Sequence, residues 1–414
     1  MMGVRRFLGM AIAGLAIALT MPDVTGARVE AMPASAKSWV GSWAASPQPL
    51  DDCPVSLTDV TLRQIVHLTL GGHAVRVRLD NTFGKGPVTF GRVHVALQHR
   101  DGAIRADTDR PVRFGGKRSV TVAQGAQALS DPIRLPIAAE SNLAVSLYLP
   151  GSAEVTGHHN AGQTSYVSVP GDHVAEAGAS SYTATISDWY WLSGVDVFTA
   201  SSRGAIVVLG DSITNGAWSA WARNGRWPDY LARRQLQLPS SHRRSVLNQG
   251  IDGNKMLLHG VCCGNSVPAL ARLHRDVIAQ VGVTHVLVLM GTHDLADNGE
   301  AAALIAGYKQ LATQLHAQGL VVVGGTLPPW GGFDDTGAHE TERQKFNQWL
   351  RTTRHVDGFV DFDQILHDPL HPARLLPAYD SSDHLHPSPA GYEAMGSAID
   401  LTLFRSIQTS SGSS

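Results

Sequence analysis

The stretch AIVVLGDSITNG, residues 205–216, joins an unbroken apolar run to a glycine, an aspartate and a serine. Apolar runs without alternation are typical of parallel strands that are buried on both faces of a sheet. In open parallel sheets, ligands bind beyond the carboxyl ends of the strands. The stretch therefore predicts a buried strand that places Ser212 at a site on the carboxyl edge of a sheet.

Downstream of this stretch, strand-like and helix-like segments alternate. Unbroken apolar runs recur at residues 284–290 and 320–327, and amphipathic segments occupy residues 266–280 and 300–319. Such alternation is typical of a parallel sheet with helices on both faces. Residues 201–408 are therefore predicted to form an α/β domain with a flavodoxin-like, doubly wound parallel sheet.

The sequence upstream of this domain has a different period. In VRVRLD, residues 75–80, apolar side chains alternate with charged ones, and residues 93–97 and 143–149 repeat the alternation of apolar positions. Short segments of period two, separated by Gly, Pro, Asn and Asp, are typical of antiparallel strands. Residues 37–200 are therefore predicted to form an antiparallel β-sandwich or jelly-roll domain.

Residues 1–36 have the features of an export signal. Two arginines precede an apolar run at residues 7–19, which is shorter than the roughly 20 residues needed to span a bilayer. Small residues offer cleavage after Ala27 or after Ala36. A membrane anchor is the alternative, but we expect a secreted or periplasmic protein without stable membrane insertion after cleavage.

The composition is that of a globular and nearly neutral protein. Of the 414 residues, 43% are hydrophobic and 16% are charged, and the formal net charge is −2. A basic field that would recruit nucleic acid is therefore not expected. The small polar residues 409–414 are predicted to form a flexible tail, and the oligomeric state is left open.

The chain has three cysteines, an odd number, so at least one thiol stays outside any intramolecular disulfide of the exported protein. Cys262 and Cys263 are adjacent, and Cys53 lies far upstream. This spacing supports neither a zinc site nor a cysteine nucleophile. A disulfide between Cys53 and either neighbour remains open, as do three buried thiols. We expect no metal and no cofactor.

A serine hydroxyl attacks poorly until a base removes its proton, and an acid must fix the orientation of that base. The segment DSSDHLHPSPAGY, residues 380–392, offers Asp383 and His386 three positions apart, just ahead of a predicted final helix. A short loop can turn both side chains toward one point. Together with Ser212, they predict a catalytic triad.

An ester hydrolase also needs donors for the oxyanion that develops on the substrate. Gly253, in NQGIDGN at residues 248–254, is a candidate because its bare backbone N–H permits close approach; the alternative is a turn glycine with positive φ. His293, in LMGTHDLAD at residues 289–297, is a candidate donor, a second base or an ordinary loop histidine.

Four blocks carry a resemblance to a known family. GDSIT, N-x-G-x-x-G, G-x-x-D and D-x-x-H-P, in this order over roughly residues 200–408, resemble the SGNH (GDSL-type) serine hydrolases. The resemblance implies that Ser212 is the nucleophile, that His386 is the general base and acid, and that Asp383 is its partner. It also implies oxyanion donors at the backbone N–H groups of Ser212 and Gly253 and at an asparagine in the third block.

The third block departs from the pattern of the family. The family usually has G-x-N-D, whereas this chain has Gly291-Thr292-His293-Asp294. An asparagine amide donates at any pH, whereas a neutral imidazole donates from only one nitrogen. Our hypothesis is that His293 takes over the donor role and that a neighbour such as Asp294 sets its tautomer.

The upstream half also resembles part of known proteins. GSWAASPQ (41–48), RVRLDNTFG (76–84) and WLSGVDV (191–197) are similar to the β-domain of exported SGNH esterases of the acetylxylan-esterase-like and lipase-like group. Such a domain binds carbohydrate, covers the cleft or stabilises the fold. A further sequence feature, the pair His158-His159, is a candidate metal site or, more commonly, a structural pair.

The prediction is an exported, metal-independent serine esterase that cleaves carboxylic esters through an acyl-enzyme. Small acyl groups such as acetyl on carbohydrate are the expected substrates. Lipid or lysophospholipid esters are one alternative, and acyl transfer to a sugar hydroxyl by the same triad is another. The alternative outside the enzymes is a carbohydrate-binding surface protein with an inactive hydrolase domain.

Overall fold

The computed structural model describes residues 38–50, 54–260 and 266–405. The predicted export signal, its cleavage positions after Ala27 and Ala36, and the tail at 409–414 lie outside these residues. So do Cys53, Cys262 and Cys263, so their pairing stays a prediction.

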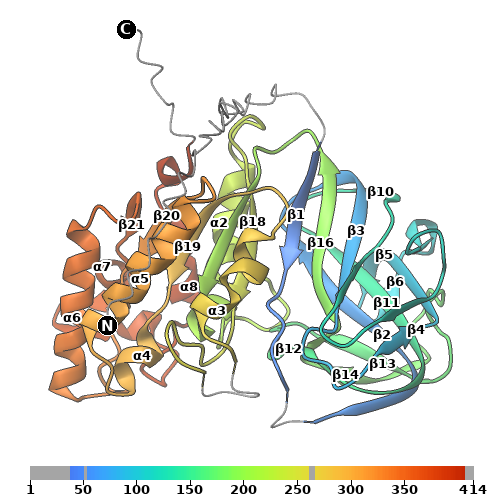
Figure 1. Ribbon diagram of the computed structural model, residues 1–414, viewed down its shortest axis with the longest axis horizontal. Coiled ribbons are helices and arrows are strands. Elements are labelled where there is room, and N and C mark those ends of the chain that lie inside the picture. The colour runs from blue at the N-terminus through green and yellow to red at the C-terminus, as the bar shows by residue number, and fades with distance from the viewer. Residues whose placement is uncertain (1–37, 51–53, 261–265, 406–414) are drawn as a thin grey trace, which may run out of the picture. The chain divides into compact units, whose positions relative to one another are not determined.

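Residues 205–404 contain a sheet of five parallel strands in the order β18-β17-β19-β20-β21 (Figure 1). The strands are β17 (Ala205–Gly210), β18 (Ser245–Gly250), β19 (Val283–Leu289), β20 (Val321–Gly325) and β21 (Gly358–Val360). Numbered along the chain, this order is 2-1-3-4-5, that of flavodoxin-like folds. All six residues of β17 are buried, as its unbroken apolar run predicted.

Helices cover both faces of this sheet. They are α1 (Ser212–Asn215), α2 (Trp227–Leu236), α3 (Ala269–Leu273), the π-helical turn η2 (His274–Ile278), α4 (Thr292–Ala296), α5 (Ala301–His316), α6 (Gly337–Thr352), α7 (Phe362–Leu366) and α8 (Pro389–Ala398). In Figure 1, α3 and α5 lie in front of the sheet, and α2 and α8 lie behind it. The helices α2 and α8 pack against each other, as do α5 and α6. The predicted doubly wound parallel sheet is therefore confirmed.

Residues 38–199, which we call the antiparallel half, contain two larger antiparallel sheets. The first consists of β1 (Ser38–Ala44), β16 (Leu192–Thr199), β3 (Gly72–Asp80) and β10 (Ile133–Ile137), with β9 (Gln127–Leu129) on β3. The second consists of β14 (Tyr182–Ile186), β13 (Ser165–Pro170), β2 (Ser56–Leu68), β11 (Ser141–Glu154), β5 (Arg92–Arg100) and β6 (Ala103–Ile104), with β7 (Arg110–Pro111) on β5. The predicted antiparallel strands are confirmed, whereas the choice between a sandwich and a jelly roll stays a prediction.

Alternation decides which side chains of β3 are buried. Val75, Val77 and Leu79 are fully buried, whereas Arg76 and Arg78 are partly exposed. This is the period of two expected for a strand with one face in the core. The two arginines form ion pairs with Asp196 of the neighbouring strand β16.

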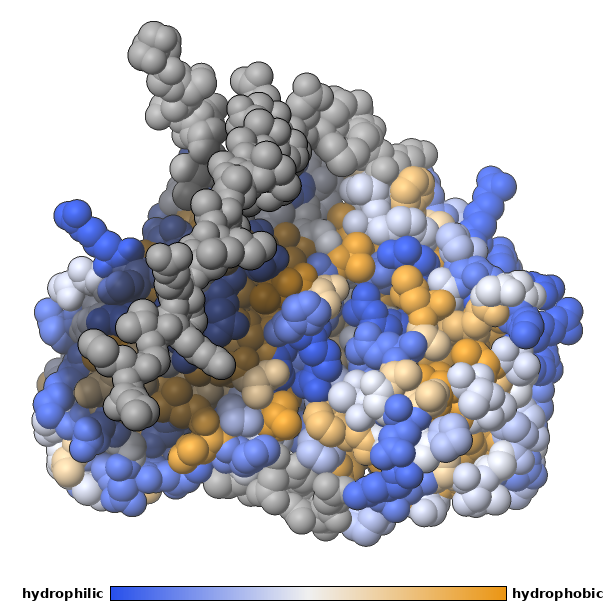
Figure 2. All heavy atoms as spheres, in the orientation of Figure 1, coloured by the Kyte–Doolittle hydropathy of each residue, from blue (hydrophilic) through white to orange (hydrophobic). Residues whose placement is uncertain are grey.

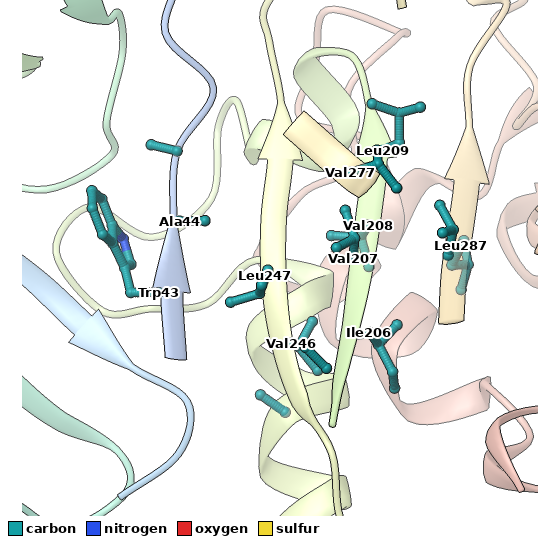
Figure 3. Close-up of a cluster of buried hydrophobic side chains, with 14 of the residues drawn as sticks. Trp43, Ala44, Ile206, Val207, Val208, Leu209, Val246, Leu247, Val277 and Leu287 are labelled. Carbon is teal, nitrogen blue, oxygen red and sulfur yellow. The ribbon is translucent and has the colours of Figure 1, made fainter. Parts of the chain in front are cut away.

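The two halves share a core. The described residues belong to one compact unit. Figure 3 shows side chains of β17, β18 and β19 packed together, with Trp43 and Ala44 of β1 beside β18. Gly41 of β1 donates its amide to the carbonyl of Val281 (2.9 Å). A Cβ atom at Gly41 would lie 2.8 Å from the Leu247 side chain, so a glycine permits this close packing. The predicted domain boundary at residues 200/201 stays a prediction.

Hydrophilic and hydrophobic residues are interspersed over the antiparallel sheets on the face in Figure 2. Large exposed apolar side chains include Trp218 (63% exposed), Leu258 and Leu370. Within the part of the chain that the structure describes, no helix is both long enough and apolar enough to cross a bilayer.

Candidate active site

Three predicted site residues follow three adjacent strands of the parallel sheet. Ser212 lies after β17, Gly253 after β18 and His293 after β19. Because β17 lies between β18 and β19, the carboxyl ends of the three strands are neighbours at one edge. This is the point at which the strand order changes direction, where open parallel sheets bind ligands.

Helix α1 holds Ser212 at the end of β17. The Asp211 carboxylate caps this helix by accepting a hydrogen bond from the Ile213 amide (3.0 Å). A Cβ atom at Gly250 would lie 2.3 Å from the Asn215 backbone nitrogen, so only glycine lets α1 pack this closely on β18. Since Ser212 is the first residue of the helix, its amide has no partner within it.

The structure brings Ser212, His386 and Asp383 together. The Ser212 Oγ atom lies 2.8 Å from Nε2 of His386, although the two residues are 174 positions apart in the sequence. The other ring nitrogen, Nδ1, lies 2.6 Å from Oδ2 of Asp383. The imidazole therefore lies between the hydroxyl and the carboxylate, which is the arrangement that the triad prediction requires.

The Asp383 carboxylate is held by its own loop. Its Oδ1 atom accepts hydrogen bonds from the amides of His386 (2.8 Å) and Leu385 (3.0 Å) and from the Ser381 hydroxyl (2.9 Å). Burial raises the pKa of Asp383, but the hydrogen bonds from His386 and Leu385 outweigh it and lower the pKa to about 2. The ionised carboxylate accepts from Nδ1–H and leaves Nε2 free to accept the serine proton.

Gly253 combines the two roles considered for it. It is buried with a φ of +66°, the left-handed region that favours glycine, so it is a turn glycine. No hydrogen bond within the described residues uses its amide, and the same is true of the Ser212 amide. Both N–H groups are therefore available to bind an oxygen atom of a ligand.

His293 lies in the first turn of α4, which follows Gly291 in a backbone conformation of φ +126°. Burial, and then the nearby His386, lowers the pKa of His293. The imidazole is therefore neutral near pH 7 and donates from one nitrogen. Its ring makes no hydrogen bond to other described residues, so that donor is available to a ligand.

The expectation that Asp294 sets the tautomer of His293 is wrong. The Asp294 carboxylate accepts hydrogen bonds from the amides of Met256 (2.8 Å) and Leu257 (3.1 Å). Adjacent residues on a helix do not face each other, so the side chains of Asp294 and His293 point in different directions. The carboxylate instead ties α4 to the loop that follows Gly253.

Arg272, which no sequence motif had marked, has a fully buried guanidinium behind the strand ends. It donates to the carbonyls of Gly210 (3.1 Å) and Gln249 (2.8 Å) and to Oδ1 of Asn254 (3.0 Å). It also pairs with Asp276 one helical turn away (3.1 Å). This one side chain thus connects the carboxyl ends of β17 and β18 to the residue after Gly253.

The histidine pair of the antiparallel half is divided between two environments. His159 pairs with Asp188 (3.1 Å). His158 is buried, with Nδ1 3.0 Å from the Ser46 carbonyl oxygen and Nε2 3.0 Å from Oδ1 of Asn215 in α1. Among the described residues, no group of three or more His, Cys, Asp or Glu side chains is arranged to hold a metal ion.

Asp211 makes the stability of the protein depend on pH. Its Oδ2 atom is buried without a hydrogen-bond partner among the described residues. Burial raises the pKa of Asp211 from 3.8 to about 7. The folded state therefore binds this proton more tightly than the unfolded state does. The resulting stabilisation is fully present below pH 3.8 and is lost as the pH rises through 7.

The Asp211→Asn substitution is expected to stabilise the folded protein, relative to the wild type, more strongly as the pH rises. The asparagine side chain keeps an oxygen that accepts from the Ile213 amide, and it does not ionise. Relative to the wild type, its free energy of unfolding should increase by about 2–4 kcal/mol between pH 4 and pH 8. Urea unfolding at both pH values measures this. Asp400→Asn is the matched control, because Asp400 also caps a helix but is exposed, and hydrogen bonds from Thr402 lower its pKa. Its relative stability should fall as the pH rises, and equal trends in both variants would contradict the prediction.

Comparisons with known proteins agree with the blocks that the sequence displays. Residues 208–394 match the model of the GDSL-like lipase/acylhydrolase family. No curated protein matches the chain in sequence.

Among solved structures, the chain is similar to an aryl esterase from M. smegmatis, with 17% identity, 47% of this chain and 95% of that chain covered, and a TM-score of 0.37. It is also similar to a carbohydrate acetylesterase from Sinorhizobium meliloti (16% identity, 47% and 95% covered, TM-score 0.37). A third similar structure is a GDSL-like lipase from Bacteroides thetaiotaomicron (19% identity, 48% and 87% covered, TM-score 0.35).

The matched range includes Ser212, Gly253, His293, Asp383 and His386. Residues 208–394 thus carry a GDSL-like lipase/acylhydrolase domain, and the protein is a carboxylic ester hydrolase.

Proposed function

We propose that this protein is an exported serine esterase that removes small acyl groups, acetyl above all, from carbohydrate through an acyl-enzyme. The observation that carries the mechanism is the unbroken chain of contacts from Ser212 through His386 to Asp383 at the strand ends. The predicted export signal and the antiparallel half, which we propose to be a β-sandwich or jelly-roll accessory domain, support the location and the substrate.

In the proposed first step, the Ser212 oxygen attacks the ester carbonyl while Nε2 of His386 takes the hydroxyl proton. The negative charge that develops on the carbonyl oxygen is stabilised by the amides of Ser212 and Gly253 and by the His293 ring. Protonated His386 then gives its proton to the departing alkoxide, and the acyl group remains on Ser212. The ionised Asp383 stabilises the imidazolium throughout.

In the second step, a water molecule replaces the alcohol. His386 takes a proton from the water as its oxygen attacks the acyl carbon, and the same donors bind the oxyanion again. The bond to Ser212 breaks, the serine regains its proton from His386, and the carboxylic acid leaves. A sugar hydroxyl in place of water gives acyl transfer, so the competition between these two nucleophiles separates a hydrolase from a transferase.

Exposed tryptophans near α1 support a carbohydrate substrate. Trp218 and Trp221 follow the nucleophile helix and are 63% and 50% exposed. The Trp221 indole nitrogen donates to the Thr164 hydroxyl of the antiparallel half (2.8 Å), which fixes the ring. An aromatic ring with one polar atom held in place presents a rigid apolar face, against which the C–H groups of a sugar ring can pack.

The test compares p-nitrophenyl acetate, butyrate and octanoate, and then acetylated xylan, as substrates of the purified protein. We expect kcat/KM to fall as the acyl chain lengthens, and acetate to be released from xylan. A higher kcat/KM for octanoate would favour a lipase-type esterase instead. If no ester is cleaved and a fluorophosphonate forms no adduct with Ser212, the protein is a binder and the proposed function is wrong.

A further inference from the structure

A group of buried and partly buried polar side chains connects the antiparallel half to the proposed catalytic residues. We call it the bridging group; its members are His158, Asn160, Asn215 and Asp252. Asn215 is the last residue of α1, three positions after Ser212, and Asp252 directly precedes Gly253. The group therefore contacts both segments that supply the proposed nucleophile and the proposed oxyanion donor.

Asn215 is the centre of this group. Its Nδ2 atom donates to Oδ1 of Asp252 (2.8 Å) and to the backbone carbonyl of Asn160 (3.1 Å). Its Oδ1 atom faces Nε2 of His158 at 3.0 Å. Asn160 closes the group, because its Nδ2 atom donates to Oδ2 of Asp252 (2.7 Å). The amide of Asn215 thus has partners at each end, and the Asp252 carboxylate is held by two amides.

The members from the antiparallel half are themselves rigidly held. The His158 ring stacks on Trp189, with ring centroids 5.6 Å apart and an interplanar angle of 29°. Asn160 has a φ of +58°, a conformation that asparagine tolerates better than most residues. Its backbone N–H donates a hydrogen bond to Oδ1 of Asp188 (3.0 Å). His158 and Asn215 are only 2% and 3% exposed. Rigid, buried partners fix a contacting group more precisely than mobile surface side chains do.

His158 is held by a polar contact at each ring nitrogen. Nδ1 faces the Ser46 carbonyl oxygen and Nε2 faces the Asn215 side-chain oxygen. Burial lowers the pKa of His158, and the two oxygen atoms and the Asp252 carboxylate oppose that shift only in part. Removing the ring leaves buried polar atoms without partners, which is costly.

From these contacts we propose that His158 and Asn160 are positioning residues, which hold α1 and the Gly253 loop in register for catalysis. The inference rests on the proposed roles of Ser212 and Gly253. Neither side chain touches the reacting atoms. Both act through Asn215 and Asp252, so the antiparallel half completes the active site from behind. A misplacement of about 1 Å between nucleophile and oxyanion donor is enough to reduce turnover about 100-fold.

The test replaces His158 with Phe, which keeps the stacking on Trp189 and removes both polar contacts, and Asn160 with Ala. We expect kcat on p-nitrophenyl acetate to fall about 10- to 100-fold, with KM changed less than about twofold. His158→Gln, which retains one polar contact, should recover part of the lost kcat.

The matched control is Thr69→Val. Thr69 also connects the two halves, because its hydroxyl lies 3.1 Å from the Val246 carbonyl and 3.2 Å from the Val246 amide, but it contacts neither α1 nor the Gly253 loop. This variant should lower the thermal midpoint and leave kcat unchanged. Equal losses of kcat at equal losses of stability in both kinds of variant would overturn the proposal.

Amide hydrogen exchange separates this proposal from the proposed function. In His158→Phe, exchange should accelerate at residues 212–216 and 250–254 and stay unchanged in β19 and α5. Unchanged exchange in the first two segments would refute the positioning role even if the protein is an esterase. If the wild type cleaves no ester, the proposed function fails, and the exchange result still decides whether the bridging group holds these segments.

Discussion

Ser212→Ala is expected to lower kcat on p-nitrophenyl acetate by about 10⁵–10⁶-fold, because the variant has no nucleophile to form the acyl-enzyme. A small residual rate over water should remain, since the oxyanion donors are unchanged. His386→Ala should cost about as much, and the double variant should be little worse than either single one, because the triad acts as a unit. Steady-state rates of the three variants measure this.

The thermal midpoint of Ser212→Ala should stay close to that of the wild type, since the substitution removes a single side-chain hydrogen bond. Ser180→Ala is the matched control, because Ser180 is an exposed serine of the antiparallel half that contacts Glu176. It should retain full turnover. If Ser212→Ala keeps more than about 1% of the wild-type kcat, acyl-enzyme formation at this serine is refuted.

His293→Ala is expected to lower kcat by about 10²–10³-fold with little change in KM, the usual cost of one lost oxyanion donor. The reason is that the oxyanion forms only as the reaction proceeds, so the lost hydrogen bond belongs to the transition state. Because burial and the nearby His386 lower the pKa of His293, the wild-type ring donates as a neutral imidazole near pH 7. The variant should therefore have the same kcat deficit across pH 7 to 9.

His293→Asn is the informative companion variant, because it restores the residue usual at this block in the family. The asparagine amide donates without any tautomer choice, so this variant should recover most of the turnover lost in His293→Ala. Wild-type turnover in His293→Ala would show that the ring is not a donor. A loss in His293→Asn as large as that in His293→Ala would instead indicate a role that only an imidazole fills.

Local sequence patterns were sufficient for the parallel sheet and for the three residues of the triad. The unbroken apolar run at 205–210 is typical of a parallel strand buried on both faces, and such a strand places the following serine at the carboxyl edge of the sheet. Asp383 and His386 are close in sequence, and their loop brings the carboxylate to the ring through its own amides. In both cases, the information lies within about a dozen residues.

The contacts that sequence patterns did not predict join residues that are far apart in the chain. Asn215 is 55 positions from Asn160 and 57 from His158, so no local spacing announces their contact. Arg272 lies in a segment whose pattern predicts only an amphipathic helix, yet its guanidinium is buried under two strand ends. Asp294 shows the opposite error, since adjacency to His293 suggested a contact that helical geometry prevents.

The pairing of β1 with β16 sets an order of assembly. These strands come from the two ends of the antiparallel half, Ser38–Ala44 and Leu192–Thr199, so every strand of its larger sheets is synthesised before Ser212. A chain that emerges from its N-terminus first can therefore complete this scaffold early, since domains generally fold as units in the order of synthesis. His158 and Asn160, which contact the end of α1, are thus present in the chain before Ser212 and Asn215 are added.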